Sequence, residues 1–117
     1  MVYIFFQFVY LERNNYYYEN HTIKTEDGYI LLTVRIPYGK NASSNMAIGP
    51  PVLFMHCILC TFYDFLNAGP ERAIGFEILE QGYDVWLLNI RGNTYSRKHV
   101  TLDPDLNPSG FWNFRKL

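Results

Sequence analysis

The residues best suited to chemistry lie between positions 56 and 60, where His56 directly precedes a Cys-x-x-Cys motif formed by Cys57 and Cys60. This spacing occurs in redox pairs and in halves of zinc sites. A redox pair has its first cysteine at a helix N-terminus, whereas apolar residues surround this motif. The other candidate zinc ligand, His99, lies far along the chain. The sequence therefore predicts two inert, buried thiols and no metal site.

The serines do not lie in a nucleophile motif. Ser43, Ser44, Ser96 and Ser109 are the four serines of the chain, and none stands in Gly-x-Ser-x-Gly. That motif presents a serine on a sharp turn between a strand and a helix. A histidine without a nucleophile performs no acyl transfer, so His56 is interpreted as a strand-end residue bonded to nearby backbone.

Other polar residues are predicted to be structural. Asp84 begins a strand and should cap or pair there, and Asp103 and Asp105 flank a proline in a turn. Residues 91–93, Arg-Gly-Asn, should shape the turn after the last strand, with Arg91 able to pair with an acid of the predicted hairpin. His99 is expected to be solvated in a surface loop.

Composition excludes several classes of partner. The 117 residues suffice for one small domain, and 49% are hydrophobic, which allows a core. A net charge of −1 gives no attraction to nucleic acid or to an anionic membrane surface. Apolar runs are too short to cross a bilayer, which needs about 20 residues. The sequence calls for no cofactor.

Signals for secretion are mixed. Asn20 and Asn41 each begin an Asn-x-Ser/Thr sequon and are candidate glycosylation sites. Residues 2–10 are apolar apart from Gln7, yet no Lys or Arg precedes them and no small residues follow, so they make a weak signal peptide. Residues 1–20 are therefore treated as an N-terminal extension that could be a degenerate leader, and residues 21–117 as the domain.

The positions of these residues depend on a hairpin and a βαβ unit. Residues 21–25 and 29–36 alternate like strands around Asp27-Gly28, a hairpin turn signal. Residues 52–55 and 85–88 are uninterrupted apolar runs, typical of parallel strands covered on both faces. A helix from Pro70 to Leu79 should connect them and end at Gly82. Residues 89–117 are predicted to be loop with a short helix.

Five segments between residues 21 and 114 have a distinctive combined order and spacing: residues 25–31, 35–37, 69–71, 82–99 and 111–112. In these segments the chain resembles the acid lipases, the α/β-hydrolases that include gastric and lysosomal acid lipase. The resemblance implies an α/β fold: the N-terminal part of an α/β-hydrolase, a β-hairpin followed by a βαβ unit in an incomplete sheet. It also implies a lipid ester substrate for the parent family, either triacylglycerol or steryl ester, and a secreted or lysosomal location.

The resemblance also assigns site residues. His56-Cys57-Ile58 matches a family His-Gly-Leu, which makes the Ile58 backbone N–H a candidate half of the oxyanion hole and His56 a candidate for the substrate pocket. Cys57 replaces a glycine and is expected to disfavour the tight turn. The Ser, acid and His of the triad would all follow residue 117, so these residues alone are expected to be inactive. The alternatives are a non-catalytic module that binds lipid or a partner, and a truncated product without function.

The resemblance finally implies an unpaired strand. In the family, the strand that matches residues 52–55 lies between the strand that matches residues 85–88 and the strand leading to the nucleophile. Without that second neighbour, its backbone groups are open to pairing with another chain. Self-association through this sheet edge, beside an uncovered apolar face, is expected.

Overall fold

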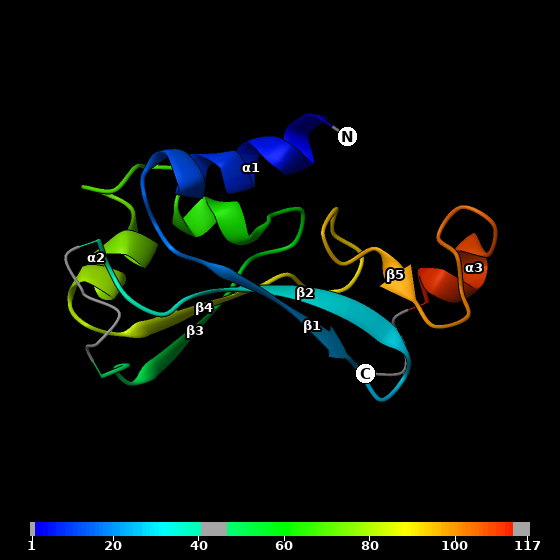
Figure 1. Cartoon of the computed structure of the whole chain (residues 1–117). Coiled ribbons are helices and arrows are strands. Elements are labelled where there is room, and N and C mark those ends of the chain that lie inside the picture. The colour runs from blue at the N-terminus through cyan, green and yellow to red at the C-terminus, as the bar shows by residue number, and fades with distance from the viewer. Residues whose placement is uncertain (1, 41–46, 114–117) are drawn as a thin grey trace.

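A computed structural model of the chain describes residues 2–40 and 47–113, with side chains described from residue 8 onward (Figure 1). One mixed sheet forms its centre, and short helices lie around it. The elements in chain order are α1 Val2–Arg13, β1 Glu19–Lys24, β2 Tyr29–Ile36, β3 Pro51–Met55, the 3-10 helix η1 Phe62–Phe65, α2 Ile74–Glu80, β4 Asp84–Leu88, β5 Lys98–His99 and α3 Pro108–Phe111.

The sheet confirms the predicted fold class. Its order is β1-β2-β4-β3, with β5 paired to the far end of β2. The β1–β2 and β2–β4 pairs are antiparallel, and β3 runs parallel to β4. A hairpin thus leads into a strand–helix–strand unit, as predicted, and the sheet is incomplete.

The hairpin turn differs in length from the two-residue signal in the sequence. Thr25 N–H donates to the carbonyl of Tyr29 at 2.8 Å, so residues 26–28 form a three-residue loop. Gly28 N–H donates to the carbonyl of Thr25, and Gly28 has φ +96°. This is the common arrangement of a turn followed by a glycine bulge. Gly28 therefore supplies the positive φ, and Asp27 does not.

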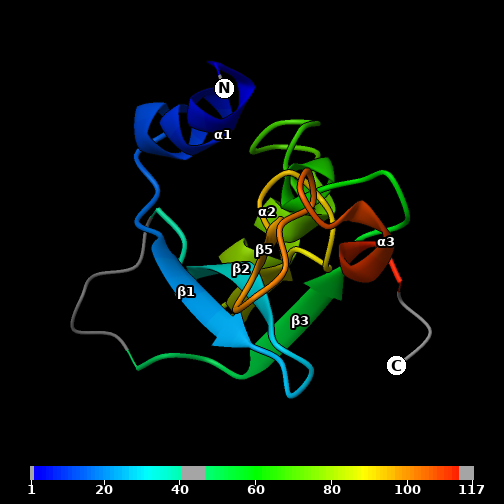
Figure 2. The same ribbon diagram turned by 90° about the vertical axis from the view of Figure 1, so that its right-hand side faces the viewer.

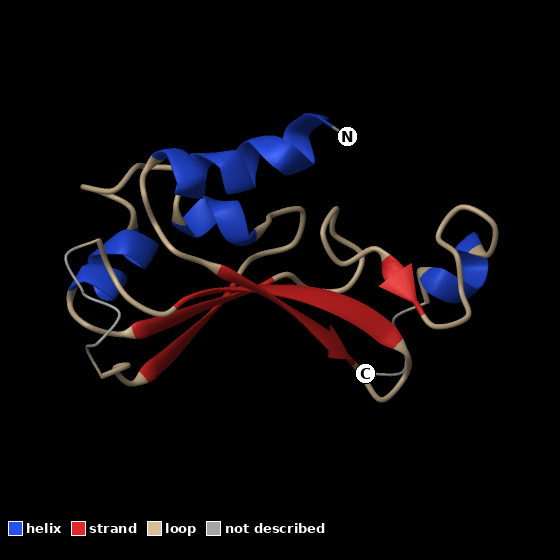
Figure 3. Ribbon diagram, in the orientation of Figure 1, coloured by secondary structure: helices blue, strands red, loops and turns tan. Residues whose placement is uncertain are grey.

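The helices lie on one face of the sheet (Figure 3). α1, η1 and α2 all lie on that side, whereas no described helix lies against the other side. The uncovered apolar face expected beside β3 is therefore present, and the described residues do not cover β3 and β4 on both faces as the apolar runs alone suggested. Leu53 and Met55 of β3 are 59% and 61% exposed, and Trp86 and Leu88 of β4 are half-buried. Alternate side chains of a strand point to opposite faces, so one layer of helices buries only every second residue.

The predicted connecting helix is shorter than expected. α2 begins at Ile74, and residues 70–73 form a turn in which Ala73 N–H donates to the carbonyl of Gly69 at 2.9 Å. Phe76 and Leu79 are buried, but Ile74 is exposed. Gly82 ends the helix as predicted, with φ +96° and its N–H bonded to the Leu79 carbonyl.

The segment before the hairpin contributes to the core. Leu11 of α1 and Tyr16 are buried, and the ring of Tyr16 stacks on Phe76 with centroids 4.6 Å apart. Phe8 stacks on Phe62 in the same layer. These contacts join residues 8–16 to η1 and α2. No described helix has the length and apolar character required to span a membrane.

The C-terminal part contains more structure than predicted. The short helix appears as α3, in agreement with the sequence. Lys98 and His99 add a two-residue strand to β2, where only loop was expected. α3 lies away from α1 (Figure 2), and its Phe111 packs against Tyr29, the first residue of β2.

Candidate active-site pocket

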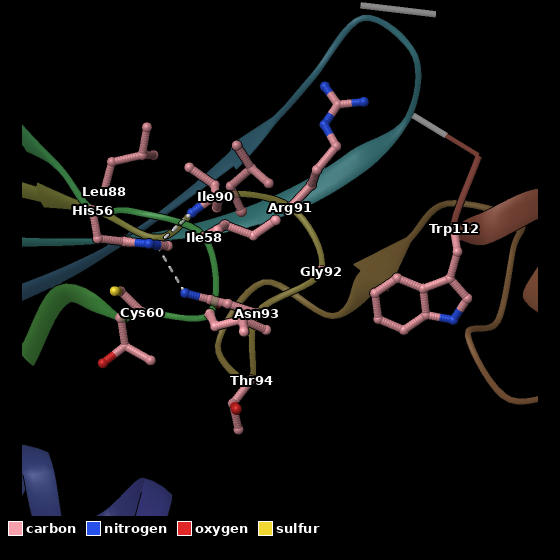
Figure 4. Close-up of a pocket in the computed structure, with 13 residues that line it drawn as sticks. His56, Ile58, Cys60, Leu88, Ile90, Arg91, Gly92, Asn93, Thr94 and Trp112 are labelled. Atoms are coloured by element: carbon pink, nitrogen blue, oxygen red, sulfur yellow. Dashed lines mark hydrogen bonds between the residues drawn. The ribbon is translucent and has the colours of Figure 1, made fainter. Parts of the chain in front are cut away.

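A pocket opens at the carboxyl ends of β3 and β4. The two strands are parallel, so the residues that follow them, His56 and Asn89, lie at the same edge of the sheet. The cavity has a volume of about 710 Å³, within the range of small-molecule sites. Its lining is mostly apolar and includes Ile58, Leu88 and Trp112, and its polar members include His56, Arg91 and Asn93 (Figure 4).

His56 is buried at the inner side of this pocket, with 7% exposure. The backbone N–H of Ile90 points at its Nε2 at 3.1 Å, and the Asn93 amide nitrogen lies 3.0 Å from the same atom. Nε2 must therefore accept, which places the ring proton on Nδ1. That proton is donated to the Cys57 carbonyl at 2.8 Å. The interpretation of His56 as a strand-end histidine bonded to backbone is confirmed.

Asn93 shapes the turn after β4, as predicted for residues 91–93. Its Oδ1 accepts from the backbone N–H groups of Tyr95 and Ser96, both at 3.0 Å. Its Nδ2 donates to His56 and to Asn89 Oδ1. The same side chain thus closes the turn and orients the histidine.

Asn89 and Ser96 extend the network into the core, and the sequence reasoning missed both roles. Asn89 is fully buried; its Oδ1 accepts from Phe62 N–H at 3.1 Å, and its Nδ2 donates to the Leu32 carbonyl at 3.0 Å. Ser96 Oγ donates to the Asn89 carbonyl and accepts from Leu32 N–H. The available signal was a single amide residue between two apolar ones at the end of a buried strand. Such a residue needs internal partners.

The loop after His56 corrects the prediction of buried thiols. Cys57 and Cys60 form a disulfide, with Cα atoms 5.3 Å apart. Cys57 is exposed, and Cys60 is half-buried where it lines the pocket. The apolar neighbours suggested burial, yet Ile58 and Leu59 are 82% and 100% exposed. Closing so short a loop stabilises the fold by only about 2 kcal/mol in the chain-entropy account.

The expected effect of Cys57 on the turn is also wrong. Cys60 N–H donates to the Cys57 carbonyl at 3.1 Å, so residues 57–60 make a tight turn. The positive φ of this turn, +66°, falls on Leu59 and not on Cys57. Ile58 lies in the middle of the turn at the pocket. Within residues 2–40 and 47–113, no group accepts a hydrogen bond from its N–H.

The hairpin and the 91–93 turn are joined by an ion pair, as the sequence allowed. Arg91 donates to Asp27 at 2.5 Å, and its guanidinium lies 4.4 Å from the centre of the Tyr29 ring. Hydrogen bonds from Arg91 and Thr25 hold the pKa of the Asp27 carboxyl below its usual value. This pair fixes one wall of the pocket to the sheet.

The remaining predicted polar residues lie outside the pocket. Asp84 pairs with Arg35 through two bonds of 2.9 and 3.1 Å, and these bonds raise the pKa of Arg35. Asp103 Oδ1 caps the turn that contains Asp105, as predicted. The prediction for His99 is wrong: it is half-buried against Tyr29, and its ring nitrogens bond to the backbone of residues 27, 101 and 102.

The glycosylation candidates are only partly placed. Asn20 is exposed on β1, whereas Asn41 lies outside the described residues, as do Ser43 and Ser44. Among the residues that the structure describes, no group of three His, Cys, Asp or Glu side chains could hold a metal ion.

Comparison with protein families decides the assignment. Residues 9–69, just over half of the chain, match the family described as the partial alpha/beta-hydrolase lipase region. The chain belongs to this lipase family. The resemblance to acid lipases is thereby confirmed, and the matched region begins inside α1. The boundary drawn at residue 20 stays a prediction.

Individual relatives agree with the family. Over 96 residues, this lipase-family chain is 42% identical to the gastric triacylglycerol lipase of Rattus norvegicus, a match that covers 82% of this chain and 24% of that protein. Lipase member K of Mus musculus is 42% identical over 85% of this chain and 24% of its own length. Lipase lipl-5 of Caenorhabditis elegans is 43% identical over 89% of this chain and 26% of its own. The chain thus spans about a quarter of the length of the relatives it matches.

Proposed function

We propose that these residues form the part of a lipase that receives a lipid ester at the carboxyl ends of β3 and β4. The supporting observation is the apolar cavity of about 710 Å³ with the exposed turn of Ile58 at its side, in a chain of the lipase family. The names of the relatives favour triacylglycerol as the substrate class. A steryl ester remains the alternative lipid ester.

In this proposal the Ile58 backbone N–H donates to the oxyanion that forms when an ester carbonyl is attacked. Such a donor must be free of internal partners and point at the reacting oxygen. The apolar lining would hold the acyl chain, and His56 would line the pocket without exchanging protons, because both of its nitrogens are already bonded. No serine of the chain stands in Gly-x-Ser-x-Gly, so these residues alone are proposed to be inactive.

Binding and hydrolysis should be measured separately on the 117-residue chain. A fluorescent long-chain acyl probe should bind, whereas a nitrophenyl ester should be hydrolysed no faster than with denatured chain. Leu59→Asp should weaken probe binding, because Leu59 lines the pocket and is fully exposed. Leu106→Asp is the matched control, since Leu106 is 81% exposed and does not line the cavity. Equal binding by both variants would contradict the proposed pocket, and hydrolysis that survives repurification would contradict the proposed inactivity.

The location follows from the family in the same way. We propose passage through the secretory route, with a secreted or lysosomal end point and glycans on Asn20 and Asn41. The exposure of Asn20 supports a glycan there. Expression in a secretory host and treatment with an endoglycosidase should shift the mobility of the chain, and Asn20→Gln and Asn41→Gln should each remove one shift. A chain that shows no shift would exclude glycosylation.

A second proposal concerns the non-catalytic alternative, in which the chain binds a partner. We propose that copies of the chain associate through β3, whose only described neighbour is β4 and whose Leu53 and Met55 are exposed. An unpaired strand edge beside apolar side chains is a template for pairing. Leu53→Lys should shift the sedimentation coefficient toward that of a monomer. Ile48→Lys, at an exposed position outside the strands, should not.

A further inference from the structure

We propose that the Cys57–Cys60 disulfide is a thiol-exchange site, at which a small-molecule thiol opens the turn that carries Ile58 and Leu59. The site is independent of ester binding: it would respond to thiols whether or not the neighbouring pocket receives a lipid. It has three parts, which are an accessible sulfur, a turn that the bridge holds closed, and a histidine bonded to that turn.

Access to the disulfide is open on the Cys57 side. Cys57 is exposed, Cys60 is half-buried, and the two residues between them are the most exposed apolar residues of the pocket lining. Thiol exchange requires a thiolate to approach one sulfur, and exposed disulfides are the labile ones. An attacking thiolate should therefore reach Cys57 Sγ first.

The bridge holds a conformation that its residues do not favour. Leu59 has φ +66°, in a region that suits glycine. For a leucine, the population of this conformation is about tenfold lower than that of the favoured ones. The Leu59 side chain is fully exposed, so no packing offsets this unfavourable conformation. Apart from the disulfide, one backbone bond, from Cys60 N–H to the Cys57 carbonyl, closes the turn. Cleavage of the bridge should let Leu59 return to negative φ.

Opening of the turn would change the hydrogen bonding of His56 but not of the residues beyond it. The Cys57 carbonyl accepts both from Cys60 N–H and from His56 Nδ1–H. Movement of this carbonyl removes the partner of Nδ1. The other ring nitrogen stays bonded to Ile90 N–H and Asn93, whose own partners lie in the buried network. The sheet and the core should therefore be unaffected.

The exchange is a two-electron reduction by two thiols. A thiolate RS⁻ attacks Cys57 Sγ, the S–S bond breaks, and Cys60 Sγ leaves as a thiolate that takes up a proton. A second thiolate attacks the mixed disulfide at the sulfur of R and releases RSSR, and the Cys57 thiolate is then protonated. Two RSH molecules thus yield RSSR and two cysteine thiols, and the reverse reaction restores the bridge.

The test combines alkylation with amide hydrogen exchange on the intact 117-residue chain. Glutathione is the probe for a monothiol, and dithiothreitol the probe for a dithiol. Mass spectrometry should find both cysteines alkylated after treatment, and exchange at Cys60 N–H should accelerate by about tenfold. Exchange in the β2–β4 ladder, for example at Val34, is the internal control and should not change.

Two variants separate the roles of the bridge and of Leu59. The double variant Cys57→Ser, Cys60→Ser should show the fast exchange without any thiol. Leu59→Gly should retain slow exchange after reduction, because glycine accepts positive φ and the turn then needs no bridge. The proposal is overturned if neither thiol reduces the disulfide, or if reduction leaves the hydrogen exchange of the Cys60 N–H unchanged. It is also overturned if hydrogen exchange in the β2–β4 ladder accelerates equally, which would mean general unfolding.

Discussion

Two glycines with the same backbone angle offer a controlled test of how the hairpin is attached to the C-terminal loop. Gly28 and Gly82 both have φ +96°. A Cβ added at Gly28 would lie 2.8 Å from the imidazole of His99 and from Val100, whereas a Cβ at Gly82 would meet nothing within 4 Å. Alanine at either position therefore has the same cost in backbone free energy, but only alanine at Gly28 also clashes with neighbouring side chains.

The expected magnitudes follow from these surroundings. A left-handed alanine costs about 1–2 kcal/mol, and the lower entropy of the unfolded chain returns about 0.4–1 kcal/mol. Gly82→Ala should thus destabilise the fold by about 1 kcal/mol or less. At Gly28 the new methyl group must also displace His99, whose Nε2 is bonded to the Asp27 carbonyl at 2.8 Å. Overpacking of this kind costs about 1–3 kcal/mol more.

The assay is urea unfolding of both variants. If the dependence of the unfolding free energy on urea concentration has the same slope for both, the difference between the midpoint concentrations reports the difference in stability. We expect Gly28→Ala to be the less stable variant by about 1–3 kcal/mol. Equal stability would show that the contact between His99 and the hairpin turn is not formed in solution. A lower stability for Gly82→Ala would contradict the reasoning from both angles and distances.

Three further outcomes are expected. Asn89→Ala should cost about 2–4 kcal/mol, because it leaves the buried Phe62 N–H without an acceptor, while Asn67→Ala at an exposed position should stay within about 0.5 kcal/mol in the same unfolding assay. Burial raises the pKa of three of the ten tyrosines, Tyr16, Tyr18 and Tyr95, to about 12, so these three should ionise at higher pH than the others in an ultraviolet titration. Since the neutral phenols favour the folded state, stability should fall between pH 10 and about 12, and a single titration near pH 10 would contradict this. The folded state lowers the pKa of Asp27 from its ordinary value of 3.8, so the contribution of Asp27 to stability should be complete above that value and lost as pH falls through the lowered pKa. Asp27→Asn should therefore reduce the loss of stability at acid pH.

Local pattern was sufficient to predict the hairpin and the parallel strand pair, but not the pairing of β2 with β4 or the short strand β5. The hairpin follows from alternation around Gly28, and the parallel pair follows from two short apolar runs on either side of a helical segment. These signals depend on neighbours in the chain, which a sequence displays directly. A pairing of Arg91 with an acid of the hairpin was also predicted, but the sequence did not single out Asp27 as the partner.

Long-range arrangement was harder to predict. The apolar character of β3 alone indicated burial on both faces; only the resemblance to a larger family indicated an uncovered face, where Leu53 and Met55 are indeed exposed. The disulfide was missed because apolar neighbours suggested a closed core, whereas the turn points outward. Leu11 lies in an apolar N-terminal run that resembles a leader, and its burial in the core is invisible in composition.

The strand order determines which strands can pair first while the chain is being synthesised. β4 lies between β2 and β3 in the sheet, yet it follows both in the chain. The β1–β2 hairpin can form within microseconds of leaving the ribosome, because its contacts are local. β3 emerges next and has no partner until Leu88 has cleared the exit tunnel. A nascent chain that stalls before that residue would present β1, β2 and β3 without the β4 strand that lies between β2 and β3, and chaperones bind such partly folded segments.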